Sequence, residues 1–410
     1  MLKDRTINNR FKITTYMTVI IAICIVLTII IYPKDAVDAA KNGLSTWFNI
    51  VLPSLLPFFI GSEILVGLGV VNFLGSLLNP IMGPLFNVSG KGAFPLAMSI
   101  TSGYPVGVKL VSNLRLKNTI TRTEAQRLSS FCSTSGPLFM IGAVSVGMFR
   151  NVSIGPLIVI SHYLGAITVG IIFSYYKRNE RPSSDPKNNG NYIKTALQEL
   201  LRSRKEDNRP LGVLMGDSVK EGMNTMFMVG GFIILYSVVI RILEITSVLT
   251  AISNLISFVF PFINNKEIIH ATLSGVIEIT NGCSLVSSVS SVELSTKISV
   301  ASLLIGWSGL SIHSQSMTML SKTDINTKIY ILAKALHGIF AFGYSYILYN
   351  FAFKNYIAAS SIVASETNYI FTPTWTGVFK FSLKMWGSIT LTLIILTMLV
   401  SIIYRVKSKI

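Results

Sequence analysis

Two apolar stretches of the chain carry glycine, proline and small polar residues at their midpoints. Pro95–Leu114 contains Ser102-Gly103-Tyr104-Pro105, and Ile268–Val289 contains Thr280-Asn281-Gly282-Cys283. Glycine and proline interrupt a helix, and interrupted backbone at membrane depth survives only where protein or a water-filled cavity satisfies its polar groups. Half-helix ends of this kind bind small charged solutes in transporters. We therefore predict a solute site between two re-entrant hairpins, with two kinked ordinary spans as the alternative.

Small polar residues around these breaks form the expected lining of the site. They are Ser102, Gly103, Tyr104, Ser133, Thr134, Ser135, Asn281, Gly282, Ser308, Ser311, His313 and Gln315. Their hydroxyl and amide groups suit a polar solute, although small hydroxyl residues also let transmembrane helices pack closely. A protonated His313 would attract an anion, and a histidine bonded to a backbone carbonyl is the alternative. His162 and His337 are expected to be packing residues.

Charged side chains inside apolar runs are the second group of candidates. Glu63 lies in the middle of the run Trp47–Val71, where we expect it to carry a proton, bind a coupling cation or form a structural pair. Glu278 precedes the second break and is expected to coordinate a cation, pair with a cationic side chain or staple the hairpin. Lys109 follows the first break and suits an anionic substrate, with snorkelling to the membrane surface as its alternative. Lys334 is expected to snorkel to the inner surface.

Other kinds of chemistry find no support in the sequence. It contains no Walker A, HExxH, GxSxG or Rossmann fingerprint, and its four histidines are scattered. Cys24, Cys132 and Cys283 show no CxxC spacing and are expected to be small buried hydrophobes. We predict a protein that is not an enzyme and has no metal or cofactor, apart from a coupling cation such as Na⁺ or H⁺.

The composition indicates a helical protein that crosses the lipid bilayer several times. Hydrophobic residues make up 50% of the chain and charged residues 13%, about half the usual charged share. A transmembrane β-barrel would give a much weaker hydropathy signal. The net charge of +17 lies in short segments between apolar runs, which argues against nucleic-acid binding.

Eight apolar runs have about the length that crosses a hydrocarbon core. They are Tyr16–Tyr32, Trp47–Val71, Ser133–Phe149, Ile154–Tyr176, Thr225–Thr246, Val300–Leu320, Ile329–Phe353 and Met385–Tyr404. The first is long for a signal peptide, which favours a retained anchor. With both termini in the cytoplasm, the cytoplasmic segments hold 25 Lys and Arg residues and the opposite side holds 8, a bias that supports this orientation.

Short motifs recur in the same order in the two halves of the chain. G-[LM]-[SN]-T-[WM]-F occurs at 43–48 and 222–227, and Ile100-Thr101-Ser102-Gly103 matches Ile279-Thr280-Asn281-Gly282, both at an offset of 179. Ser135-Gly136 matches Ser308-Gly309, and Gly165 with Gly170 matches Gly338 with Gly343, at an offset of 173. Because the copies start on opposite sides in the predicted topology, we expect an inverted repeat.

The expected domain organisation follows from these spans and repeats. It comprises an N-terminal anchor (1–34), a first gate repeat (35–176) with its hairpin (93–114), a cytoplasmic basic linker (177–210), a second gate repeat (211–353) with its hairpin (268–289), and an external loop with a C-terminal transmembrane helix (354–410).

Four segments together resemble one known family. They are Ser99–Leu110, Ser133–Met140, Glu278–Cys283 and Gly306–Gln315, and the likeness extends from about Ala36 to Tyr404. The sequence resembles the sporulation integral membrane protein family YlbJ, also called SpoVV, whose gate segments resemble those of concentrative nucleoside transporters. The resemblance implies a transporter that moves dipicolinate (pyridine-2,6-dicarboxylate) from mother cell to forespore across the outer forespore membrane. The alternatives are a permease for nucleosides or other small organic anions and a non-transporting membrane scaffold of a sporulation complex. Assembly as a homo-oligomer stays open.

Overall fold

The described part of the protein is built entirely from helices. The computed structural model describes residues 16–180 apart from 18 and 21, residue 182, and residues 192–259, 265–357 and 383. Every regular element in these residues is a helix, and several are apolar. The described part of the protein is therefore all-helical, consistent with a chain that crosses the membrane several times. The expected span Met385–Tyr404 lies outside the described residues.

The first half of the chain begins with a bent helix and ends with a long one. Its elements in chain order are α2 (Pro33–Thr46), η1 (Trp47–Val51), α3 (Leu52–Gly67), α4 (Val70–Phe86), η2 (Gly90–Gly92), α5 (Ala93–Ser102), α6 (Val106–Leu116), α7 (Arg122–Phe131), η3 (Phe139–Met148), η4 (Val152–Ile154) and α8 (Gly155–Ser174). Before them, residues Ala22–Ile31 form a short apolar helix. Non-helical residues 132–136 separate α7 from the helical segment that contains η3.

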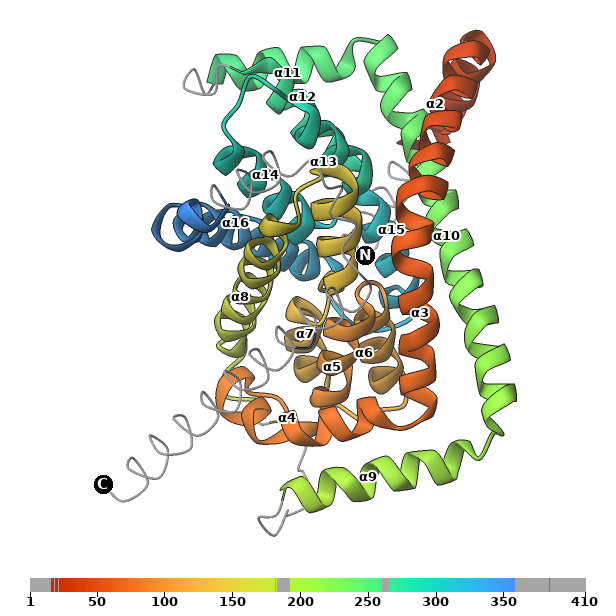
Figure 1. Ribbon diagram of the computed structural model, residues 1–410, viewed down its shortest axis with the longest axis vertical. Coiled ribbons are helices and arrows are strands. Elements are labelled where there is room, and N and C mark those ends of the chain that lie inside the picture. Colours follow the sequence, from red (N-terminus) through yellow and green to blue (C-terminus); the bar gives the residue numbers. More distant parts are fainter. Residues whose placement is uncertain are drawn as a thin grey trace, which may run out of the picture.

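The second half is also a series of helices. Its elements are α10 (Leu211–Ile245), α11 (Val248–Val259), α12 (Lys266–Ile277), α13 (Ile279–Ser288), α14 (Leu294–Trp307), α15 (Gly309–Leu320), α16 (Thr327–Leu348) and η5 (Tyr349–Phe353). The long helix α10 runs beside α2 and α3 (Figure 1), so the two halves lie against each other along their first helices. Helix α9 (Tyr192–Asp207) falls within the expected linker and packs against α4.

Some of the predicted spans are single helices, whereas two others are broken. Val152–Ser174, Leu211–Ile245 and Thr327–Ile357 are long and apolar enough to cross a membrane, and Pro33–Val51 with Leu55–Gly67, bent by 53°, would make a fourth span among the described residues. The expected spans Ser133–Phe149 and Val300–Leu320 are not single continuous helices. Residues 132–136 are not helical, and Ser308 and Gly309 have φ angles of 80° and 75°, which an α-helix does not contain.

Each predicted break folds two short helices back on each other. Gly107 on α6 lies against Ser99 on α5, and Gly282 on α13 lies against Gly275 on α12. The second break is at Glu278, however, and not at residues 280–283 as predicted. The extended backbone of Glu278 (φ −137°, ψ 117°) ends α12, and residues 280–283 belong to the first turns of α13.

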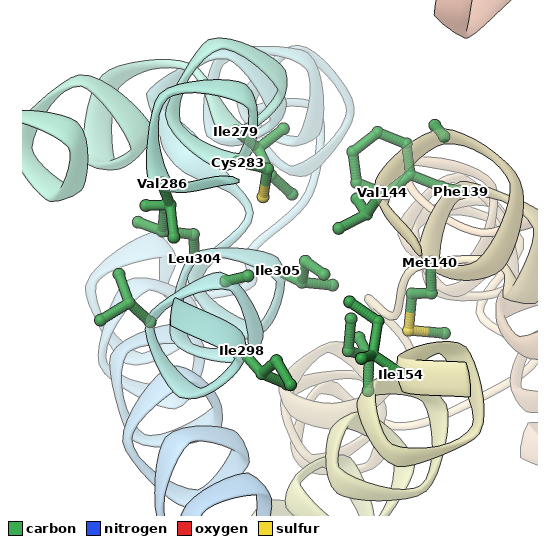
Figure 2. Packing of buried hydrophobic residues seen from close by; sticks show 14 of the residues in the cluster. Phe139, Met140, Val144, Ile154, Ile279, Cys283, Val286, Ile298, Leu304 and Ile305 are labelled. Carbon is green, nitrogen blue, oxygen red and sulfur yellow. The ribbon is translucent and has the colours of Figure 1, made fainter. Parts of the chain in front are cut away.

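The two halves share one apolar core. In Figure 2, Phe139, Met140 and Ile154 of the first half face Ile298, Leu304 and Ile305 of the second half, and all six side chains are buried. A second contact joins residues that the repeated motif makes equivalent: Trp47 Nε1 donates a hydrogen bond to the Met226 carbonyl at 3.0 Å, across a separation of 179 residues. Burial of this surface couples the halves mechanically as well as energetically.

Candidate functional site

A cavity of about 60 Å³ lies where the helix breaks of both halves meet. Its polar wall consists of Ser102, Gly103, Tyr104, Ser135, Gly136, Glu278, Thr280, Ser311 and Gln315. Its apolar wall comes mainly from the bent helix of η1 and α3, from the residues around the start of η3 and from α10, and comprises Val51, Leu55, Phe59, Leu138, Phe139, Val229, Phe232, Ile233, Ile279 and Ile312. Neither half forms this cavity alone.

Two glycines allow the breaks to approach each other. Gly103 has φ +77°, and a Cβ on it would lie 2.7 Å from the Gly136 nitrogen. Gly309 has φ +75°, and a Cβ on it would lie 3.0 Å from the Ile279 nitrogen. Only glycine adopts these conformations readily and leaves room for the neighbouring backbone. The first hairpin therefore touches the break after α7, and the second hairpin touches the break between α14 and α15.

Several polar atoms of the cavity wall are buried without a hydrogen-bond partner among the described residues. They are Ser102 Oγ, Ser311 Oγ and Gln315 Oε1. Buried polar atoms in proteins are nearly always hydrogen-bonded, and each exception calls for an explanation such as a ligand or ordered water. Three such atoms on one cavity wall are what a site for a polar solute provides.

Glu278 acts as the N-cap of α13 in this structure. Its side chain is buried and accepts a hydrogen bond from the Asn281 N–H at 2.7 Å. Among the described residues, no cationic side chain lies within ion-pair distance of it. The Asn281 side chain does not line the cavity but donates to Ser237 Oγ on α10 at 2.7 Å, and Gly282 packs against Gly275. Asn281 and Gly282 were expected to line the site. In the structure Asn281 instead fastens the second hairpin to α10, and Gly282 lets α12 and α13 pack closely.

Other expected lining residues lie beside the cavity rather than on its wall. Thr134 is hydrogen-bonded to Ser99 through both its backbone N–H and its hydroxyl. Ser133 Oγ contacts the Tyr330 hydroxyl at 3.0 Å, and Ser308 provides the left-handed turn before α15. His313 is buried between the rings of Trp307 and Tyr330, and neither of its ring nitrogens has a hydrogen-bond partner among the described residues.

Lys334 does not reach a membrane surface, contrary to the expectation that it snorkels. Its side chain is fully buried, and Nζ donates to the Ser133 carbonyl at 2.6 Å and to His337 Nδ1 at 3.2 Å. Nζ also lies 5.7 Å from the ring centroid of Tyr104, a cavity residue. Helix α16 begins at Thr327, so Lys334 lies about two turns inside it, where neighbouring helices enclose it.

The two other charged candidates lie away from the cavity. Lys109 is exposed on α6, and Glu63 lies in the last turn of α3 rather than in the middle of a span. Neither residue lines the cavity. Of these lysines, Lys334 and not Lys109 lies beside the cavity, which the sequence alone did not reveal.

His162 and His337 belong to the same buried polar network as Lys334. The His337 Nε2 contacts the His162 carbonyl at 2.9 Å, and the Ser135 N–H donates to His162 Nε2 at 2.9 Å. The two imidazole rings are 4.4 Å apart between centroids. Their expected role as packing residues is thus incomplete, because they also hold the break that carries Ser135.

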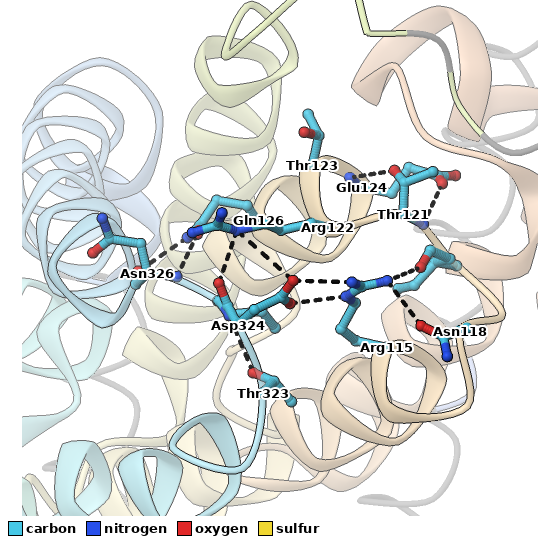
Figure 3. A network of polar contacts seen from close by, with 12 residues as sticks. Arg115, Asn118, Thr121, Arg122, Thr123, Glu124, Gln126, Thr323, Asp324 and Asn326 are labelled. Carbon is cyan, nitrogen blue, oxygen red and sulfur yellow. Dashed lines mark hydrogen bonds and ion pairs between the residues drawn. The ribbon is translucent and has the colours of Figure 1, made fainter.

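A polar cluster also joins the halves away from the cavity (Figure 3). Arg115 donates to both carboxylate oxygens of Asp324 at 2.8 and 2.9 Å, and Arg122 donates to the Asp324 carbonyl at 2.9 Å. Gln126 exchanges two hydrogen bonds with the backbone of Asn326. These five residues, the Asp324 clasp, connect α6 and α7 to the loop between α15 and α16. The paired Arg115 holds the pKa of Asp324 below its usual value.

Comparison with known proteins connects this architecture to a family. Residues 48–149 match the Gate family, described as "Nucleoside recognition". The chain is 42% identical over 338 residues to the "Sporulation integral membrane protein YlbJ" of Bacillus subtilis (strain 168). The aligned residues cover 81% of this chain and 82% of that protein. No solved structure matches the chain. With several apolar helices, a gate segment that contributes to the cavity, and this degree of identity, the chain belongs to the sporulation integral membrane protein YlbJ family.

Proposed function

We propose that this integral membrane protein is a secondary transporter that moves dipicolinate from mother cell to forespore during endospore formation. In this proposal it lies in the outer forespore membrane with both termini in the cytoplasm. It has eight transmembrane helices and two re-entrant hairpins, arranged as an inverted repeat similar to that of concentrative nucleoside transporters. The two hairpins gate alternating access, and transport is coupled to Na⁺ or H⁺.

The observation that carries the proposal is a buried lysine next to a polar cavity. Lys334 has no carboxylate within ion-pair distance among the described residues, and the cavity beside it holds three polar atoms without partners. A dianion that enters a low-dielectric site costs several kcal/mol unless a cation accompanies it. The Lys334 amine and the cavity hydroxyls are groups that could meet the carboxylates of such a substrate.

The size of the cavity supports a closed conformation of such a transporter. Pockets for small molecules typically measure about 300–1,000 Å³, whereas this cavity measures about 60 Å³. A hairpin must therefore move before an aromatic dicarboxylate can enter. The Asp324 clasp connects the two halves and would have to open if its end of the molecule became the entrance.

The order of the helices supports the repeat. Both halves run through a long or bent helix, a shorter helix, a hairpin, a broken helix and a second long helix. The contact between Trp47 and Met226 joins equivalent positions, as expected near a pseudo-two-fold axis.

Uptake of labelled dipicolinate into proteoliposomes that contain only this protein tests the proposal. Uptake above that of protein-free liposomes, with competition by unlabelled dipicolinate but not by uridine, is the expected result. Competition by nucleosides with no dipicolinate uptake would favour a nucleoside permease, which the description of the Gate family suggests. Absence of transport for both solutes, with normal sporulation after substitutions in the cavity, would favour a scaffold.

A further inference from the structure

The hydrogen bonds of Lys334 define where a third partner could bind. A lysine ammonium has three N–H donors, and two of the bonds at Nζ go to the Ser133 carbonyl and to His337 Nδ1. The other His337 nitrogen, Nε2, faces the His162 carbonyl, which can only accept. His337 Nε2 must therefore carry a hydrogen, and the Nδ1 of the neutral ring accepts from the lysine.

Lys334 Nζ has two hydrogen-bond partners, which is the number that a neutral amine can donate to. A neutral amine has two N–H donors, and both are used by Ser133 and His337. A charged amine would have one further N–H and no carboxylate partner among the described residues. A buried cation without a counter-ion is unfavourable, so an anion bound in the cavity would favour the charged amine over the neutral one.

Tyr104 connects Lys334 to the cavity. The Tyr104 ring lies over the lysine amine, and Tyr104 also lines the cavity. Tyr104 also lies directly beside Gly103, whose left-handed backbone forms the hairpin break. A change in the hairpin can therefore move the ring off the amine without unfolding a helix.

We propose that Lys334 carries the coupling proton and binds one carboxylate of the transported anion after the Tyr104 ring has moved aside. This inference rests on the proposed function. The Lys334 amine takes a proton from water on the side of entry, and its third N–H binds the substrate carboxylate. On the side of exit the carboxylate leaves and the proton returns to water. One proton thus crosses with each substrate molecule, and no other co-reactant is required.

Other titratable groups surround this position and must be separated from it in a test. They are His337 and Tyr330 on α16, His162 on α8, His313 on α15 and Tyr104 at the first hairpin, while Glu278 at the second hairpin lines the cavity. In the described parts of α7 and α14, which also pack against α16, no titratable side chain lies within hydrogen-bond or ion-pair distance of Lys334.

The test measures dipicolinate uptake and proton influx together, in proteoliposomes with a pH-sensitive dye inside. The wild-type protein should accumulate dipicolinate when the exterior is more acidic, with acidification of the interior. Lys334→Met should lose at least tenfold of the uptake. Lys334→Arg, which cannot lose its proton, should retain exchange of internal for external dipicolinate but lose proton influx. Lys328→Met, exposed in the first turn of the same helix, should behave as the wild type.

Each contrary result has a separate meaning. Wild-type uptake without proton influx, or proton influx that persists in Lys334→Arg, would overturn this inference and leave the proposed function standing. Loss of proton influx in Glu278→Gln together with its retention in Lys334→Arg would assign the proton to Glu278 instead. Failure of the wild-type protein to transport dipicolinate would overturn both. Thermal unfolding of each purified variant shows whether it is folded, and the arginine variant keeps the test valid if the methionine variant is not.

Discussion

The second hairpin depends on a backbone contact at Gly282. A Cβ at this position would lie 2.0 Å from the Gly275 Cα and 2.6 Å from the Gly275 nitrogen. Non-bonded carbon atoms prefer a separation of about 3.5–4.0 Å, so Gly282→Ala should push α12 and α13 apart by about 1.5–2 Å. Overpacking of this kind costs about 1–3 kcal/mol, and the better helix propensity of alanine offsets up to about 1 kcal/mol of it. Because the overlap is with backbone atoms, the cost lies toward the upper end of this range, and we expect a net loss of about 2 kcal/mol.

The matched control is Gly231→Ala on α10, where a Cβ would meet nothing within 4 Å. This substitution should be neutral or stabilise the protein by up to about 1 kcal/mol. Thermal unfolding of the purified proteins, followed by tryptophan fluorescence, should separate the two variants by several degrees. Uptake by Gly282→Ala should also fall, because Glu278 and Thr280 on the cavity wall move with the hairpin. Equal melting temperatures for the two variants would refute the close approach of α12 and α13.

Three further predictions concern the clasp, the cavity and the orientation. Asp324→Asn should destabilise the protein by at most about 1 kcal/mol because the ion pair is partly exposed. Its arginine partner lowers the pKa of Asp324, so this stabilisation is fully present above the unfolded pKa of about 4, declines below it and is gone once the pH has fallen through the lower folded pKa. A difference in melting temperature that does not shrink as the pH is lowered through this window would contradict this. Ser311→Ala should raise the KM for dipicolinate at least about tenfold with little change in stability, since a hydrogen bond to a charged group contributes about 1.5–3 kcal/mol. The control Ser302→Ala removes another unpartnered buried hydroxyl, away from the cavity, and should leave the KM unchanged. Cysteines introduced at Lys205 and Arg150 should be labelled only from the cytoplasmic and only from the opposite side, respectively, and labelling of both from one side would contradict the proposed topology.

Local features of the site were predictable because they depend on neighbouring residues. Ser102, Gly103 and Tyr104 interrupt an apolar stretch, and they form both a hairpin break and a cavity wall. Ser135, Ser311 and Gln315 were likewise expected at the site and line the cavity. The second break was misplaced by a few residues because Gly282 suggested a turn. Its small size serves helix packing instead, while the extended Glu278 ends the helix and caps the next one.

The choice between the two lysines could not be made from the sequence. Lys109 follows a break and Lys334 follows the start of an apolar run, so distance along the chain favoured Lys109 as the substrate ligand. In the structure Lys109 points to the exterior, and Lys334 bonds to a carbonyl 201 residues away. Snorkelling depends on a free path to the membrane surface, and that path is closed by helices that the local sequence does not specify.

The sequence by itself determined that this chain is a helical membrane protein, where several of its helices run and where the first hairpin breaks. The hydropathy of a segment and the residues that interrupt a helix are local properties of the sequence, so spans and breaks can be predicted from a few turns of the chain. Only the tertiary structure decided which polar residues share a cavity and which lysine is buried beside it. Those properties arise from α8, α16 and the first hairpin together, because burial and hydrogen-bond partners depend on which distant segments enclose a side chain.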